Sequence, residues 1–330
     1  MKDNITLKKI SESLGISIST VSRALKNHPD ISAKTKQKVA ELASVLEYEP
    51  NAYAIQLRTN NSHLFGLVVS TVSNYFYDSF IATLEEECRK KGYSLLILQS
   101  GDDPATEADN LRICRQNRVS GIFACITPKT TDLEPFKKLN KMEIPVIFFD
   151  KVPEFGEFNK VCLADAYAAK LVAEIIINKK RKKVLALFGN SALSITHRRE
   201  ESFIREFEKY KSIKIFKDHI DNAEQARAIS HDYLTRTGKP DTICCMSDEL
   251  LIGAMKAIQQ LELKVPEDVA VISISNGFIP ALYYPEISYV ETSGSKLALL
   301  AFTQMMNYMA GDKRTVEIMT ESVYVKGGSI

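Results

Sequence analysis

The sequence has no long hydrophobic run and no recognisable secretory signal. None of its apolar stretches approaches the about 20 consecutive residues that a membrane-spanning helix needs. The first residues, MKDNITLKK, lack the apolar core of a signal peptide. These absences argue against a membrane protein or an exported one. We expect the protein to work in the cytoplasm, with no membrane partner.

The sequence also has few residues in patterns that bind metals or form disulfides. Its six cysteines include no C-x-x-C pair, and several fall in apolar runs, which is typical of buried thiols in a reducing compartment. Its five histidines show no H-E-x-x-H motif and no other metal-ligand spacing. We therefore expect no metal site and no cofactor.

Motifs of nucleotide-dependent and hydrolytic enzymes are absent as well. The sequence contains no G-x-G-x-x-G, no G-x-x-x-x-G-K-[ST] and no G-x-S-x-G. The SGSK segment at residues 293–296 lacks the spacing of a phosphate-binding loop. No catalytic dyad stands at a convincing spacing, so we predict that the chain is not an enzyme.

The charge of the chain is unevenly distributed. Residues 1–60 carry nine Lys and Arg against six Asp and Glu, a net +3, whereas the rest of the 330 residues carry 34 against 35, a net −1. A small basic segment on a nearly neutral body suggests a head that binds a polyanion. The length suits two or three domains.

Apolar residues recur at helical spacing from Ile5 to about Leu46, with breaks that predict three short helices. The first apolar face ends at Gly15. The second is formed by Ile16, Val21, Ala24 and Leu25, and the third by Val39, Leu42, Ala43 and Leu46.

From Leu64 onward, short apolar runs alternate with amphipathic helical segments. One series runs from LFGLVVS to PVIFFD, and a second begins after Asp165 and runs to VAVISIS. Alternating strands and helices predict an α/β fold with parallel sheets covered by helices on both faces. Two such series predict two similar lobes, with a ligand bound between them at the carboxyl ends of the strands.

The segment GISISTVSRALKN, residues 15–27, has the pattern of a helix-turn-helix, whose second helix enters the DNA major groove. Gly15 supplies the turn, and Ser17 can cap the second helix. Short hydroxyl side chains permit close approach to phosphates, and Arg23 can donate two hydrogen bonds to guanine. On residue chemistry alone, a three-helix bundle that binds a protein remains an alternative.

The resemblance to a known family decides between these alternatives. The segments STVSRALKN, ISAKTKQKV and EPNAYAIQLRT follow one another as in the lactose-repressor (LacI/GalR) family of bacterial transcription regulators. Further along, GLVVSTVSNYFYDSFIATLEEECRKKGYSLLI, PVIFFDK and LKVPEDVAVISISNGF resemble strands and helices of the family's effector domain. The resemblance therefore runs through the whole chain.

This resemblance implies a homodimer in which each head reads one half of a near-palindromic operator in double-stranded DNA. By position in the motif, Ile18 and Ser19 match the variable base-reading residues and Arg23 matches the motif arginine. Ile18 cannot donate a hydrogen bond, so it would press on a thymine methyl group. The positions that match phosphate contacts are Thr6, Ser17, Thr20, Ser22, Asn27, Ser32 and Thr35.

The segment NAYAIQLR resembles the family's hinge helix, which pairs with its copy in the minor groove. Leu57 holds the position of the leucine that wedges between base pairs, and Ala54 lies one turn earlier. Asn51 and Arg58 would contact the DNA backbone. The alternative is a leucine that merely pins the linker to the core.

The body resembles periplasmic sugar-binding proteins, which implies a small-molecule effector, a sugar or sugar derivative. Phe76 and Tyr77 match an aromatic pair that stacks on ligands, although Tyr75 replaces the usual proline and each ring could instead be a core aromatic. Asp150 ends a predicted strand and would accept hydrogen bonds from hydroxyl groups. Arg199 matches the effector-binding arginine; Arg198 is its rival, and both could be solvated surface charges.

Two further segments depart from the family's pattern. Asp248 follows a serine where the family has asparagine, and it could cap its helix rather than contact ligand. Ser275 stands where an aspartate often binds sugar hydroxyls, with Asn276 beside it. With Arg199 nearby and one carboxylate fewer, we hypothesise a phosphorylated or carboxylated sugar as effector.

We thus predict a DNA-binding transcriptional regulator, more specifically a repressor, that associates with the nucleoid. The alternatives are a sugar-binding transport protein and an enzyme on a doubly wound fold. The predicted domains are a head at 1–48, a hinge helix and linker at 49–61, and an effector-binding and dimerisation domain at 62–330. Its first lobe comprises about 62–162 and 293–321, and its second comprises about 163–291 and 322–330. No leucine-heptad tail is present, which favours a dimer over a tetramer.

Overall fold

The computed structural model describes residues 6–48, 62–73, 75–155 and 158–330. Contacts divide the chain into two compact units, Met1–Ser62 and His63–Ile330. Within the described residues, no helix is both long and apolar enough to cross a membrane.

The described part of the first unit is a small helical bundle. Its helices are α1 (Leu7–Leu14), α2 (Ile18–Leu25) and α3 (Ala33–Val45). Ile10, Val21, Ala24, Val39 and Ala43 are buried together and form its core. The prediction that Leu25 lies on the inward face of α2 is wrong. Leu25, in the last turn of α2, is 37% exposed and is not among the residues that pack in the core of the bundle.

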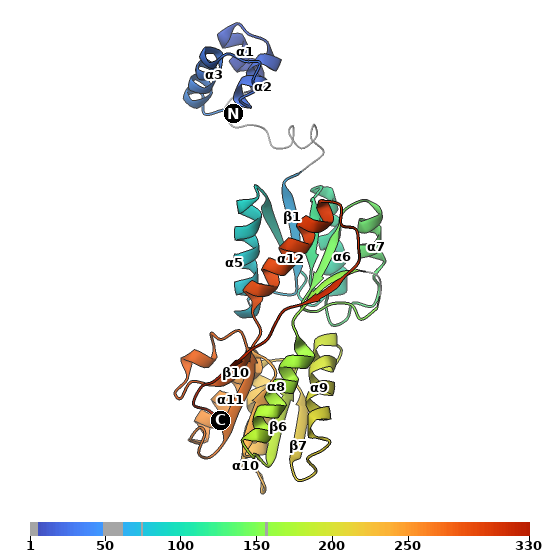
Figure 1. Cartoon of the computed structure of the whole chain (residues 1–330), viewed down its shortest axis with the longest axis vertical. Coiled ribbons are helices and arrows are strands. Elements are labelled where there is room, and N and C mark those ends of the chain that lie inside the picture. Colours follow the sequence, from blue (N-terminus) through green and yellow to red (C-terminus); the bar gives the residue numbers. More distant parts are fainter. Residues whose placement is uncertain (1–5, 49–61, 74, 156–157) are drawn as a thin grey trace. The chain divides into compact units, whose positions relative to one another are not determined.

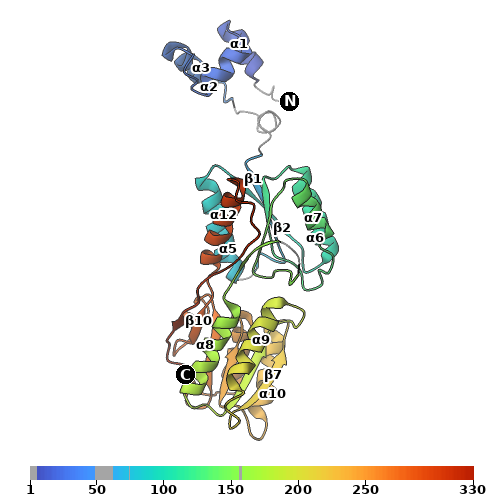
Figure 2. The same ribbon diagram turned by 45° about the vertical axis from the view of Figure 1, so that its right-hand side comes forward.

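The second unit contains two sheets, each covered by helices on both faces (Figures 1 and 2). The first sheet has the strand order β11-β5-β4-β3-β1-β2, and its described pairings are all parallel. Its strands are β1 (Leu64–Val69), β2 (Ser94–Gln99), β3 (Gly121–Ala124), β4 (Val146–Phe149), β5 (Asn159–Cys162) and β11 (Glu317–Met319). The helices around it are α5 (Tyr75–Lys90), α6 (Pro104–Gln116), α7 (Glu134–Lys141) and α12 (Gly294–Met309).

Alternation along the buried strands explains why both faces of this sheet are covered. Phe65 and Leu67 of β1 pack with α5 and α12, which lie side by side in both views. Val68, which points the other way, packs with residues of α6 and α7. A strand with apolar residues on both faces needs helices on both faces to exclude water.

The second sheet has the order β12-β10-β9-β8-β6-β7. Its strands are β6 (Lys183–Phe188), β7 (Lys214–His219), β8 (Thr242–Cys245), β9 (Ala270–Ser275), β10 (Ser288–Glu291) and β12 (Tyr324–Val325). Helices α8 (Asp165–Asn178) and α9 (Ser194–Phe207) cover one face. Helices α10 (Ala223–Thr235) and α11 (Asp248–Gln260) cover the other, and a short 3-10 helix spans Pro280–Leu282. Only β12 pairs antiparallel within the described strands of this sheet.

The chain passes between the two sheets several times. It leaves the first after β5, returns from β10 into α12, and crosses again between β11 and β12. The expected α/β class with two parallel-sheet lobes is therefore confirmed. Its consequence is that the carboxyl ends of the strands in both lobes lie near the crossing segments, where polar side chains gather.

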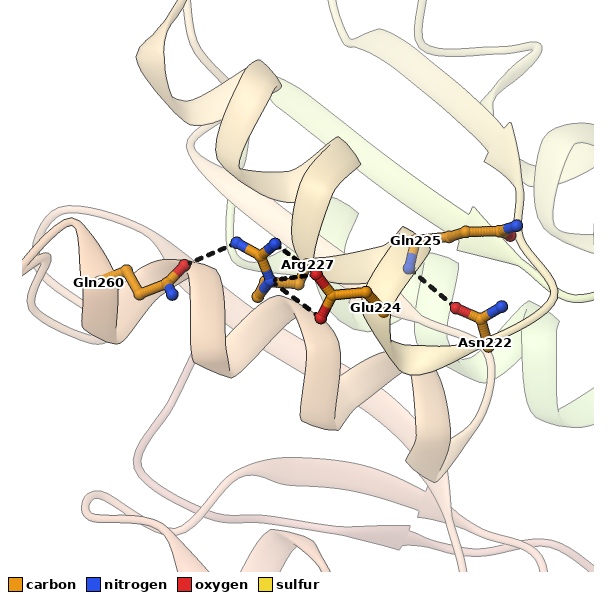
Figure 3. A network of polar contacts seen from close by, with 5 residues as sticks. All are labelled: Asn222, Glu224, Gln225, Arg227 and Gln260. Atoms are coloured by element: carbon orange, nitrogen blue, oxygen red, sulfur yellow. Dashed lines mark hydrogen bonds and ion pairs between the residues drawn. The ribbon is translucent and has the colours of Figure 1, made fainter.

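Helices α10 and α11 pack unusually closely. A Cβ atom at Gly253 in α11 would lie 2.2 Å from the Ala223 backbone oxygen and 2.5 Å from the Ala226 Cβ. A polar network spans the same pair of helices (Figure 3): Arg227 of α10 donates to Glu224 on its own helix and, at 3.0 Å, to Gln260 of α11. Glycine is therefore required at this contact.

We predict that Gly253→Ala separates these helices. Because the nearest atom belongs to the backbone and cannot rotate away, the free energy of unfolding should fall by about 1–3 kcal/mol. This fall is the net result, after the roughly 1 kcal/mol that alanine gains over glycine in helix propensity. Urea denaturation followed by circular dichroism measures the change. Gln259→Ala, an exposed substitution on the same helix, is the control. Equal unfolding midpoints for both variants would contradict the close packing.

Candidate nucleic-acid interface and effector cleft

The turn between α1 and α2 is formed as the sequence predicts. Gly15 has φ +62°, a left-handed conformation that glycine adopts without strain, and it ends α1. The Ile16 N–H then donates to the Ser11 backbone oxygen at 3.1 Å. The expected cap is also present, because Ser17 Oγ accepts a hydrogen bond from the Thr20 N–H at 3.1 Å.

The outer face of α2 presents the side chains expected to read DNA. Ser17, Ile18, Ser19 and Arg23 are exposed, whereas Thr20 and Ser22 are half-buried. Ile18 is 47% exposed although it is apolar, so the core of the bundle does not account for it. An exposed apolar residue among short hydroxyl residues suits contact with a thymine methyl group.

Hydroxyl caps recur at the start of each helix in residues 6–48. Thr6, Ser17 and Ser32 cap α1, α2 and α3. Ser32 Oγ also lies 2.9 Å from Thr35 Oγ1. Helix starts carry free N–H groups and a partial positive charge, which together favour phosphate. The expected phosphate contacts at these positions therefore also have a structural role.

Asn27 has φ +55° just beyond α2. Asparagine tolerates this left-handed conformation better than most residues, so Asn27 helps to end the helix. Its backbone oxygen accepts a hydrogen bond from Lys36 Nζ at 3.3 Å. The expected hinge contacts at Asn51, Ala54, Leu57 and Arg58 lie outside the residues that the structure describes.

In the second unit, Asp150 follows β4 and is buried at the carboxyl edge of the first sheet. Its Oδ2 accepts a hydrogen bond from the Tyr77 hydroxyl at 2.7 Å, and that hydroxyl lies 2.9 Å from Cys125 Sγ. Burial and then the Asp150 charge raise the pKa of Tyr77 well above its usual value. Asp150 has φ +57°, which is strained for aspartate.

The two expected aromatic residues differ in how deeply they are buried. Tyr77 belongs to the buried core of the first lobe, which favours the core alternative for this ring. Phe76 is half-buried and meets Tyr77 edge to face, with 5.6 Å between ring centroids. Phe76 is thus the more accessible of the two rings.

Arg199 is not a solvated surface charge. It is buried in α9, its Nη2 lies 2.7 Å from Asp165 Oδ1, and its Nη1 donates to the Met246 backbone oxygen. Burial raises the pKa of Asp165 to about 6, although the Arg199 charge acts in the opposite direction. Arg198 instead lies partly exposed, with its Nη2 2.9 Å from Glu317 Oε1.

Arg199 therefore gives less support to an acidic effector than its sequence position suggests. The positive charge of Arg199 is already balanced by Asp165, so it is not free to select a phosphate or carboxylate. Sequence reasoning missed Asp165, because its partner lies 34 residues away along the chain. Its place at the first position of α8 is the only local signal.

Asp248 does not cap its helix, which corrects one of the alternatives. Ser247 is the cap, and its side chain accepts a hydrogen bond from the Leu250 N–H. Asp248 instead accepts hydrogen bonds from Ser275 Oγ and, at 3.2 Å, from the Asn276 N–H. Burial raises the pKa of Asp248. The structure thus brings Asp248, Ser275 and Asn276 together as the sequence suggests.

A cavity of about 380 Å³ lies where the loops of the two lobes meet. The first lobe contributes Thr127, Thr130 and Lys151, and the second contributes Ser194. The Ser194 hydroxyl donates to the Val152 backbone oxygen at 3.0 Å across this junction. Lys151 and the threonines carry no motif, so sequence reasoning did not find them. Hydroxyl groups beside one lysine suit a polar small molecule, although the expected effector residues are not among those that line this cavity.

Comparisons with known proteins identify two families that the chain matches. Residues 65–313 match the family described as periplasmic binding protein domain, and residues 6–51 match the family described as bacterial regulatory proteins, lacI family. The described residues 6–48 and most of 63–330 thus fall within these two matches.

Curated relatives match along nearly the whole chain. The HTH-type transcriptional repressor PurR of Vibrio vulnificus is 25% identical over 326 residues, covering 96% of this chain and 97% of the relative. The ribose operon repressor of Lactococcus lactis is 26% identical, covering 93% and 92%. The lac repressor dimer bound to operator and the anti-inducer ONPF has the same fold, with a TM-score of 0.89, 20% identity and 99% of each chain covered.

We predict that Arg199→Met destabilises the protein in a pH-dependent way. The variant leaves Asp165 buried without its cation, which should cost about 3–5 kcal/mol at pH 8. An aspartate whose folded-state pKa is raised contributes stability below its unfolded value near 3.8, and this contribution is lost as the pH rises through about 6. Without Arg199, the pKa of Asp165 should rise further. The loss of unfolding free energy relative to the native chain should therefore grow only above about pH 6.

Urea denaturation at pH 5.5 and pH 8 measures this difference. Arg198→Met removes the same charge from a partly exposed pair and should cost about 1 kcal/mol or less at both values. A deficit for Arg199→Met that is the same at both pH values would show that the buried pair does not control it.

Proposed function

Since the chain belongs to the lacI family of bacterial regulatory proteins and is a DNA-binding transcriptional regulator with a small-molecule effector domain, we propose that it is a repressor. It binds a near-palindromic operator in double-stranded DNA as a homodimer and works in the cytoplasm, at the nucleoid. An effector, a sugar or sugar derivative, binds between the lobes and changes operator affinity. The observation that carries this proposal is a unit of three helices with a helix-turn-helix pattern in the same chain as a two-lobed body.

The relatives support the repressor and effector parts of this proposal. PurR and the ribose operon repressor are named as repressors, and the lac repressor was solved as a dimer on its operator. Another structure of this fold, with a TM-score of 0.70, 20% identity and coverage of 81% of this chain, holds D-xylulofuranose. A transport protein would not need the head, and the relatives are repressors rather than enzymes.

We assign the parts of the chain as follows. Residues 1–48 are the head, 49–61 are the hinge helix and linker, and 62–330 bind the effector and the second subunit. Ile18, Ser19 and Arg23 read bases. The capped helix starts at Thr6, Ser17 and Ser32, together with Thr20, Ser22, Asn27 and Thr35, hold phosphates, and Asn51, Ala54, Leu57 and Arg58 act in the hinge.

The effector site lies at the carboxyl ends of the strands, on Phe76, Asp150, Arg199, Asp248 and Ser275. Asp150 and Asp248 offer carboxylate oxygens to hydroxyl groups. Arg199 acts through the geometry it imposes on Asp165 and the backbone, rather than as a free positive charge. This arrangement suits a ligand that carries several hydroxyl groups.

A binding assay on genomic DNA tests the proposed function. We expect the purified full chain to retard a few fragments in a gel, to protect sites with approximate two-fold symmetry, and to release them as salt increases. Calf thymus DNA serves as the competitor for non-specific binding. Uniform retardation of all fragments, or none at any salt concentration, would exclude a sequence-specific regulator.

We predict that Arg23→Ala weakens binding to the operator so identified. Losing a bidentate contact to guanine costs about 1–3 kcal/mol, which corresponds to roughly 5- to 150-fold in affinity. Fluorescence anisotropy with labelled operator measures this loss. Lys8→Ala is the control, because it removes the same charge from an exposed residue of α1 that lies 3.8 Å from Glu12. Equal losses for both variants would mean that Arg23 contributes charge alone.

A further inference from the structure

A short segment after β9 reaches across from the second lobe to the first. The Asn276 side-chain amide, Nδ2, donates to the Tyr75 backbone oxygen at 2.8 Å, and Tyr75 begins α5 in the first lobe. Two residues further, the Phe278 ring stacks on the Tyr75 ring, with 5.6 Å between centroids and 27° between planes. Two different interactions thus join the same two segments, which lie 201 residues apart.

The segment is held firmly on its own side. The Asn276 N–H donates to Asp248 Oδ2 at 3.2 Å, and the Gly277 N–H donates to Ser275 Oγ at 2.9 Å. The Phe278 N–H donates to Asn276 Oδ1 at 3.1 Å. Both polar atoms of the Asn276 side chain are therefore used, one within the loop and one across to Tyr75.

Gly277 adds to this rigidity. It has φ +94°, and a Cβ atom there would lie 2.6 Å from the Tyr289 hydroxyl oxygen. Other residues would be strained at this φ, so glycine favours the turn that places Asn276 and Phe278. The loop therefore holds the Asn276 amide and the Phe278 ring where they can contact the first lobe.

The two rings are not core residues. Tyr75 is 48% exposed and Phe278 is 56% exposed, and neither belongs to a buried cluster. Rings of this exposure contribute little to the core of either lobe, so their contact acts mainly between the lobes. Besides the Ser194–Val152 hydrogen bond, Arg198 Nη2 on α9 and Glu317 Oε1 on β11 form a further contact between the lobes, at 2.9 Å.

We propose that Tyr75, Asn276 and Phe278 form an interlobe clasp that holds the effector cleft closed in the absence of effector. Asn276 is then a positioning residue rather than a ligand contact, which replaces its expected role. Its role in regulation rests on the proposed function. The strength of the clasp sets how much more tightly an effector must bind one lobe arrangement than the other in order to shift the equilibrium between them.

Distances between spin labels in the ligand-free full chain test the clasp. Labels are attached at Met142→Cys in the first lobe and Lys209→Cys in the second, both exposed positions. The six native cysteines are buried, so the labels should react at the engineered sites. Mixing labelled chains with an excess of unlabelled chains removes distances between subunits. Pulsed electron resonance then gives the distribution of interlobe distances.

We expect Phe278→Ala to increase the ratio of open to closed lobes by about two- to tenfold, the usual effect of one aromatic pair. Asn276→Asp keeps the acceptor for the Phe278 N–H but cannot donate to Tyr75, and it should also shift the distribution to longer distances. Phe278→Tyr keeps an aromatic ring on Tyr75, so it should give the native distribution of distances. Leu282→Ala, an exposed apolar substitution shortly after the clasp, is the matched control and should change nothing.

Distributions for Phe278→Ala and Asn276→Asp that match the native chain would overturn the clasp, as would an equal shift in Leu282→Ala. Circular dichroism melting verifies that each variant is folded. The measurement needs neither DNA nor effector. A clasp found in a chain that retards no DNA would therefore leave the clasp in place and refute the proposed function alone.

Discussion

The buried ion pair between Arg199 and Asp165 is the constraint on which the second lobe's side of the cleft depends. It joins α9 to the first position of α8, and its third bond reaches the backbone just beyond β8. Each charge would be costly to bury alone, so each requires the other to stay in place. Because α9 is fixed in this way, the residues at its start and middle that contact the first lobe, Ser194 and Arg198, are also placed.

The same constraint changes which ligands the cleft suits. Polar groups at the carboxyl ends of the strands are mostly bonded to one another: Tyr77 to Asp150, Ser275 to Asp248, and Arg199 to Asp165. A negatively charged ligand would find Arg199 already neutralised by Asp165, which leaves Lys151 beside the cavity as the cation available to it. A ligand with hydroxyl groups can donate hydrogen bonds to the Asp150 and Asp248 carboxylates without separating the Arg199–Asp165 pair. Because these side chains are already ordered in the folded protein, the ligand does not have to supply the entropy cost of ordering them.

Local features of this molecule were predictable from sequence, whereas pairings between distant segments were not. Gly15, the Ser17 cap and the alternation along β1 follow from neighbouring residues, because caps and strand periodicity are set within a few positions. The partner of Arg199, the burial of Tyr77 and the bond from Asn276 to Tyr75 depend on how strands far apart in the chain come together. The resemblance located the cleft, but it assigned roles by position and could not show which side chains already had partners.

Weak contacts are what a switch between two lobe arrangements requires. Shifting an equilibrium from 1:99 to 99:1 takes about 5.5 kcal/mol of differential binding, which a few hydrogen bonds from a small ligand can supply. A stacked aromatic pair contributes about 0.5–1.5 kcal/mol, a hydrogen bond about as much, and a partly exposed ion pair about 1 kcal/mol or less. Together, these three contacts contribute a few kcal/mol, which one ligand can reverse. A buried hydrophobic interface between the lobes would remove that possibility, so the exposure of Tyr75, Phe278 and Arg198 is consistent with a cleft that must respond to a small molecule.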